Sequence, residues 1–267
     1  MAVSKNVYDR YADAMQLVSD KGKAELMRIL PTLNTSSDDA FLADLQRVVP
    51  PLVTKYGRVS ALLSARFYDR ARRAAGGGDD YVATTFGGEK LEEVDRAVIY
   101  AATGGMALET VPSFLTGVVD MGIKSYGRET QIGNADIDPF CEGYESIPGA
   151  NPCAFCIIKA LNTWNYHNYQ GQRLEEEISD DAWHANCNCQ LLPIFRDDEQ
   201  PDLVDFDEMY QAYDDAAQAV YSGDMPDELK ERIEKAKEAN EANDGTAKWS
   251  TLNEITIAMR YQNGDMH

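Results

Sequence analysis

Four of the five cysteines and one of the three histidines fall into two short motifs that could bind a metal ion. The first motif is Cys153-Ala-Phe-Cys156, and the second is His184-Ala-Asn-Cys187-Asn-Cys189. A C-x2-C turn directs two thiolates to one point, and two more ligands would complete the tetrahedral shell that is usual for zinc. The sequence therefore predicts a zinc ion bound by side chains from both motifs.

The second motif offers three candidate ligands, His184, Cys187 and Cys189, for two places. His184 and Cys187 are three residues apart on a turn, whereas Cys187 and Cys189 share a face if the chain is extended. We favour His184 and Cys189 together with Cys153 and Cys156, and we keep Cys187 as an alternative ligand. Three thiolates and one histidine are typical of a closed, structural zinc site, which contributes free energy to folding.

Two other interpretations of the cysteines stay open, namely buried reduced thiols and disulfides. Disulfides are rare in the cytoplasm, where we expect this chain because its first residues carry no secretory signal. A catalytic zinc would instead need an open coordination position and a general base. Acids between the two motifs could supply that base, although we expect them to form a solvated loop: Glu175, Glu176, Glu177, Asp180 and Asp181.

The elements that must position these motifs are mainly helical. Apolar residues recur every three or four positions from Tyr8 to Ile29 and again from Phe41 to Phe67, as they do on one face of a helix. Pro50-Pro51 predicts a kink or two abutting helices in the second stretch. The rest of a helical bundle is expected at Glu89–Thr103 and from Met106 to about Tyr126.

Beyond the bundle the chain changes character. Residues 133–152 are rich in Gly, Pro, Asn and Asp, as loops and short strands are, and Gln190–Phe195 predicts a short strand. Helical patterns follow at 206–221, 226–242 and 251–261. We therefore predict a mainly α fold with an N-terminal helical bundle domain (1–134), a small α+β zinc-binding module (135–196) and an acidic helical tail (197–267) that could be partly disordered.

The charge is unevenly distributed along the chain. Residues 1–134 hold 17 acids and 16 bases, whereas residues 135–267 hold 28 acids and 9 bases, for a net charge of -20. The negative electrostatic field of the second half repels phosphates, which disfavours DNA binding by the chain on its own. One basic patch stands out, at Arg66, Arg70, Arg72 and Arg73. We expect it to be a solvated helix face, and the alternative is a docking site for the acidic tail of the same or a neighbouring copy.

Several function classes lack support in the sequence. The least polar stretch, residues 97–123, is interrupted by Gly104-Gly105, Glu109, Pro112 and Asp120, so we expect no membrane span. There is no Walker loop and no G-x-G-x-x-G, H-E-x-x-H or G-x-S-x-G motif. We therefore expect a structural protein and not an enzyme.

Residues 144–195, with CAFC, then WHANCNC and a closing LLPIF, resemble the C-terminal signature of phage Mu F-like minor head proteins. Cys153 and Cys156 match the first cysteine pair of that signature. His184, Cys187 and Cys189, with Asn186, match its final H-x-N-C-x-C element. In this family the residue between the last two cysteines is often arginine, and here it is Asn188.

The resemblance implies a minor capsid protein that acts in head morphogenesis at the portal vertex and assists head assembly or DNA packaging and exit. Its partners would be the portal and major capsid proteins, with contact to packaged DNA only indirectly. Self-association through the basic patch and the acidic tail is a further possibility. Its location would be the phage head, and the host cytoplasm during assembly. The alternatives are a zinc-ribbon-like nucleic-acid-binding module, although only Lys159 and Arg173 lie between the motifs, and a metal-dependent hydrolase using His184.

Overall fold

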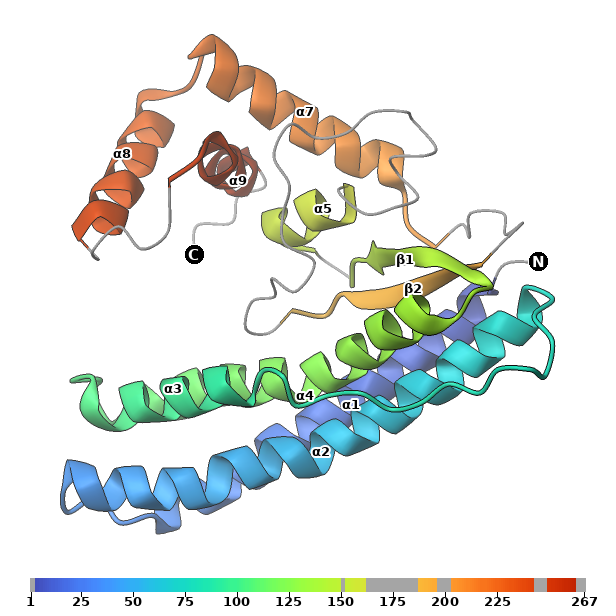
Figure 1. The fold of residues 1–267 in the computed structure, drawn as a ribbon. Coiled ribbons are helices and arrows are strands. Elements are labelled where there is room, and N and C mark those ends of the chain that lie inside the picture. The colour runs from blue at the N-terminus through green and yellow to red at the C-terminus, as the bar shows by residue number, and fades with distance from the viewer. Residues whose placement is uncertain (1–2, 150–151, 162–186, 196–202, 243–248, 263–267) are drawn as a thin grey trace. The chain divides into compact units, whose positions relative to one another are not determined.

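The computed structural model describes residues 3–149, 152–161, 187–195, 203–242 and 249–262. The chain forms two compact units, which are considered separately. Unit 1 comprises Met1–Glu145 and Asp181–Asp202, and unit 2 comprises Ser146–Asp180 and Leu203–His267. The described residues are mainly helical and contain one two-stranded sheet (Figure 1), which confirms the predicted fold class in its general form.

Unit 1 is built on three long helices that lie side by side in Figure 1. They are α1 (Lys5–Ile29), α2 (Asp38–Ala74) and α4 (Val111–Ile137). A short 3-10 turn, Leu30–Thr32, follows α1, and a shorter helix, α3 (Leu91–Thr103), packs against α2 and α4. The four helices predicted for the first half of the chain are therefore confirmed.

The core of unit 1 follows the apolar spacing of the sequence. Met15 and Leu26 on α1, Leu45 on α2 and Leu115 on α4 are fully buried. Each apolar side chain that folding removes from water stabilises the fold by about 1.5–3 kcal/mol. Among the described helices, none has the length and apolar content that a membrane crossing requires.

Helix α2 begins with a capping residue and two acids that favour helix formation, and it continues without a break to Ala74. The Ser37 hydroxyl accepts a hydrogen bond from the Ala40 amide (3.2 Å), and Asp38 and Asp39 lie in the first turn, where the helix dipole favours negative charge. The helix continues through Pro50 and Pro51 as a single element, so of the two predicted alternatives, a kink or two abutting helices, the second was wrong.

Helix α4 extends about three turns beyond the predicted end near Tyr126. Gly133, one of the residues that suggested a loop here, lies within the helix and has a packing role. A Cβ atom at Gly133 would lie 2.8 Å from the ring of Phe86, so glycine there permits close packing. The start of the predicted loop at 133–137 is therefore helical.

The sheet pairs β1 (Cys141–Ile147) with β2 (Gln190–Phe195). All six residues of β2 are buried, and the strand packs against α4 and α2. Phe195 contacts the rings of Tyr68 and Phe140, with centroid distances of 5.3 and 5.7 Å. The strand predicted at Gln190–Phe195 is confirmed, and its apolar run is explained by burial on both faces.

Unit 2 contains α5 (Ala154–Leu161), α7 (Phe206–Ser222), α8 (Asp227–Ala242) and α9 (Thr251–Gln262). The three helices predicted in the tail are confirmed. Helix α7 packs against α5 and α9, and α9 also packs against α8. The mostly polar α8 buries Leu229 and Ile233, so packing of these two side chains stabilises a helix that would be marginal alone.

Candidate functional site

The first cysteine motif lies at the start of α5. Cys153 directly precedes the helix, and its carbonyl oxygen accepts a hydrogen bond from the Ile157 amide (3.1 Å). Cys156 therefore falls in the first turn, with its sulfur atom 3.5 Å from that of Cys153. Cys156 is buried and Cys153 is half-buried, and both are reduced. The motif thus holds two thiols side by side.

Of the second motif, the structure describes Cys187, Asn188 and Cys189. Cys187 and Cys189 are reduced and are 2% and 1% exposed, whereas the intervening Asn188 is exposed. His184 and the acids at 175–181 lie outside the described residues. Three predicted ligands, Cys156, Cys187 and Cys189, are thus buried cysteines that could hold a metal ion.

Two buried cations of α4 hold the segment 187–189, within unit 1. The Arg128 guanidinium donates hydrogen bonds from Nη2 to the carbonyl oxygens of Cys187 and Cys189, both at 3.1 Å. The Lys124 ammonium donates to Oδ1 of Asn188 at 2.7 Å. These contacts fix the backbone on either side of Asn188, so the orientation of both cysteines depends on α4.

Lys124 also forms a buried ion pair on α4. Its Nζ lies 2.9 Å from Oδ1 of Asp120, four residues earlier, and both side chains are almost completely buried. The Ser19 hydroxyl of α1 donates to the same carboxylate at 2.5 Å. Burial lowers the pKa of Lys124, and the Asp120 carboxylate opposes that shift. The pair links α1, α4 and the segment that carries Asn188.

These side chains belong to a buried polar face of α4 that the sequence analysis missed. Asp120 was considered only as an interruption of the apolar stretch 97–123. A usable signal was present, because polar residues recur every three or four positions and so share one helical face. They are Asp120, Lys124, Arg128, Gln131, Asn134 and, at the helix end, Asp138, all of which are buried.

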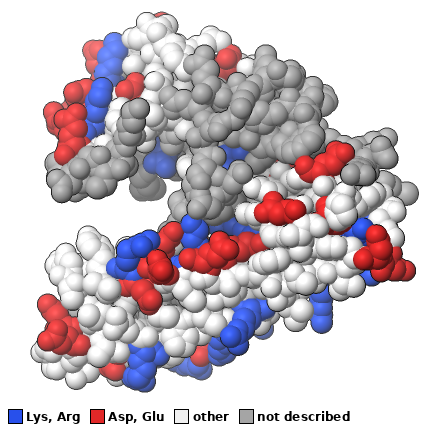
Figure 2. Space-filling view, viewed as in Figure 1, with Lys and Arg blue, Asp and Glu red and all other residues white. Residues whose placement is uncertain are grey.

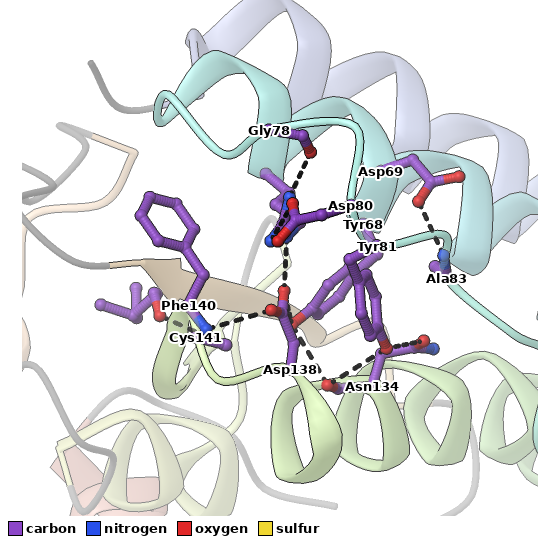
Figure 3. A network of polar contacts seen from close by, with 12 residues as sticks. Tyr68, Asp69, Gly78, Asp80, Tyr81, Ala83, Asn134, Asp138, Phe140 and Cys141 are labelled. Carbon is purple, nitrogen blue, oxygen red and sulfur yellow. Dashed lines mark hydrogen bonds and ion pairs between the residues drawn. The ribbon is translucent and has the colours of Figure 1, made fainter.

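A second polar network lies where α2 and α4 end (Figure 3). Arg72 donates from Nε to Oδ2 of Asp138 at 2.8 Å, and the Tyr68 hydroxyl donates to the same oxygen at 3.2 Å. The Phe140 amide donates to the other carboxylate oxygen at 3.0 Å. Arg72 also pairs with Asp80 at 3.1 Å. The network ties the ends of two helices to the start of β1.

This geometry corrects the predicted basic patch. Arg72 is 3% exposed and is paired, so it does not belong to a solvated face.

Two titratable groups near this network have raised pKa values. Burial, followed by the charge of Asp138, raises the pKa of Tyr81 to about 12, and burial raises the pKa of the Cys141 thiol. Both groups therefore stay protonated at neutral pH, as structural hydrogen-bonding groups do.

An extended segment leads from α2 to α3 and is tied to α4 by side chains. Asn134 accepts from the Thr84 amide at 2.9 Å and donates to the Thr84 carbonyl oxygen at 2.8 Å, as a strand neighbour would. The Thr130 hydroxyl contacts both the amide and the carbonyl of Phe86. The polar face of α4 therefore positions this segment as well as the second cysteine motif.

The chain is thus a mainly helical protein that carries buried cysteines able to hold a metal ion. It belongs to the VG15 protein family, whose model matches residues 2–216. This is a family of viral and phage gene products, so the chain is a phage-associated protein. The matched range includes the four helices α1 to α4 and both cysteine motifs.

A more distant similarity links the chain to a translation factor. The mitochondrial translation factor GUF1 homolog of Trichoplax adhaerens is 24% identical in an alignment of 205 positions that covers 70% of this chain. The chain spans 30% of the length of that relative. No solved structure matches the chain.

Proposed function

We propose that this chain is a minor capsid protein of a tailed phage, associated with the portal vertex, which assists head assembly or DNA packaging and exit. The observation that carries the proposal is the VG15 match over residues 2–216. The Mu F-like pattern of cysteines and histidine within that range makes the proposal more specific. The portal and major capsid proteins are the proposed partners, and the phage head and host cytoplasm the proposed locations.

We further propose that zinc is the metal and that its role is structural. Two sulfur ligands bound at about 2.3 Å to one tetrahedral zinc ion lie about 3.8 Å apart. The 3.5 Å separation of the Cys153 and Cys156 sulfur atoms fits that distance and is far from a disulfide bond. His184 and Cys189, with Cys187 as the alternative, would provide the remaining ligands, and the metal would contribute free energy to folding.

The assembly role is tested by looking for the protein in heads. The tagged portal protein of the same phage is purified from cells that assemble heads, with and without this chain. We expect this chain to co-purify with the portal, and peptides from it to be present in finished heads at few copies. Its absence from both samples would contradict the proposal.

The metal prediction is tested on the purified chain by elemental analysis and thermal melting. We expect about one zinc per chain. At free zinc about 100-fold above its Kd, binding adds about 2.7 kcal/mol to stability, so a chelator should lower the melting temperature. Cys156→Ser should lose the zinc, whereas the matched control Cys141→Ser, outside both motifs, should retain it. Equal zinc content in the two variants would exclude Cys156 as a ligand.

A further inference from the structure

The outer face of α2 combines arginines with exposed aliphatic side chains. At 100° per residue, its exposed positions between residues 58 and 73 fall within an arc of about 120°. They are Arg58, Val59, Leu62, Arg66, Arg70 and Arg73. Val59 is 44% and Leu62 46% exposed, which places an apolar centre within a basic stripe. Blue side chains stand out along the lower edge of unit 1 in Figure 2.

The arginines of this stripe differ from the other cations of α2. Lys55 pairs with Glu25 at 2.6 Å, and Arg72 pairs with Asp138 at 2.8 Å. Within the described part of the chain, Arg58, Arg66, Arg70 and Arg73 form no ion pair. Asp69, the one acid in this stretch of sequence, accepts a hydrogen bond from the Ala83 amide. The stripe therefore presents four cations that have no counter-charge within the described residues.

The composition of the stripe favours an acidic protein surface over nucleic acid. A phosphate backbone offers nothing for Val59 and Leu62 to pack against, whereas a helix with acids and an apolar side chain matches both parts of the stripe. Residues 1–134, which carry the stripe, are nearly neutral with 17 acids and 16 bases, so they repel an acidic partner less than the second half of the chain does.

Helix α7 has the complementary composition. It contains four acids and no base, and Asp207, Glu208 and Asp215 are exposed. Asp214 and Asp215 each accept a hydrogen bond from a glutamine of the same helix, which leaves their negative charge in place. Tyr221, 59% exposed, adds a largely apolar side chain near the C-terminal end of α7. The 17 residues of α7 span about 26 Å, close to the length of the stripe.

We propose that the basic stripe of α2 in one copy of the chain docks the acidic face of α7 in a second copy. Arginine suits this contact because its planar guanidinium can bind a carboxylate through two hydrogen bonds. Val59 and Leu62 would be covered by the partner helix. Since the charged groups are exposed, the association weakens as salt screens them.

A charge exchange tests the contact. One variant carries Arg66→Glu, Arg70→Glu and Arg73→Glu, and the other carries Asp207→Lys, Glu208→Lys and Asp215→Lys. Each variant alone brings like charges together, so its self-association should be at least 10-fold weaker than that of the unmodified chain. A mixture restores opposite charges at both contacts and should form mixed assemblies. Sedimentation velocity in 50 and 500 mM NaCl measures the masses.

Controls separate the contact from general charge effects. Arg96→Glu combined with Lys21→Glu changes exposed cations of α3 and α1 and should leave self-association unchanged. Circular dichroism checks that each variant is folded. An unmodified chain that stays monomeric at all concentrations, or a mixture that does not associate, would overturn the proposal. Binding of a DNA duplex that the arginine variant loses would assign the stripe to nucleic acid instead.

Discussion

Replacing Arg72 with methionine is expected to lower the free energy of unfolding by about 3–5 kcal/mol, the usual cost of removing one partner of a buried ion pair. The substitution would leave the Asp138 carboxylate fully buried without its cation. It would also remove the contact with Asp80 and the hydrogen bond to the Gly78 carbonyl oxygen. The methionine side chain fills much of the same volume, so lost packing adds little.

The neighbouring Arg73 provides a matched control. It lies in the same last turn of α2 but is exposed, so Arg73→Met should change stability by no more than about 0.5 kcal/mol. Urea unfolding followed by circular dichroism measures both variants. Comparable losses for the two would show that the network of Figure 3 does not stabilise unit 1 through the Arg72–Asp138 pair.

Replacing Arg128 with methionine is expected to reduce stability by about 2–4 kcal/mol, because two buried carbonyl oxygens lose a donor and each loss costs about 1–3 kcal/mol. Those carbonyls belong to Cys187 and Cys189, so the variant would also misplace two candidate ligands. Loss of a hydrogen bond that orients a metal ligand typically weakens metal binding roughly 10–100-fold. We expect a reduction of that size in zinc affinity.

Competition with a chromophoric chelator measures the zinc affinity, and urea unfolding of the metal-free chain measures stability separately. Arg128→Lys should recover part of the affinity, because an ammonium can still reach one carbonyl. Arg96→Met, on the exposed face of α3, should behave as the unmodified chain does. Unchanged zinc affinity in a destabilised Arg128→Met variant would limit Arg128 to a structural role in the bundle.

Apolar periodicity was sufficient to predict most helices of this chain. The spacing from Tyr8 to Ile29 marks the buried face of α1, and the strand at Gln190–Phe195 follows from a short apolar run. In the tail, α7 begins at Phe206, directly after its Asp205 cap, as the pattern predicts. These elements could be predicted because each has a local signal of spacing, capping or turn residues.

Spacing could show that the polar residues of α4 share one helical face, but neither the burial of these charges nor their partners could be predicted in this way. Arg72 and Asp138 are 66 residues apart in the sequence, and nothing near either residue indicates the other. Lys124 and Arg128 are counted as solvent-facing by any scale that separates apolar from polar residues, although both are buried. Their contacts depend on a segment that returns from residues 187–189, which is long-range information absent from a local pattern.

Unit 1 is discontinuous in sequence, and this has a consequence for the order in which it can fold. During synthesis α4 is complete at Ile137, about 50 residues before β2 is made. Until then the ribosome-bound chain lacks Asn188 and the carbonyl groups of Cys187 and Cys189, which are acceptors for Lys124 and Arg128 in the folded chain. Long-range closure of this kind is slow. The contacts of residues 187–189 therefore form only after α4 has been synthesised, and a chain that ends before them would leave Lys124 and Arg128 without these acceptors.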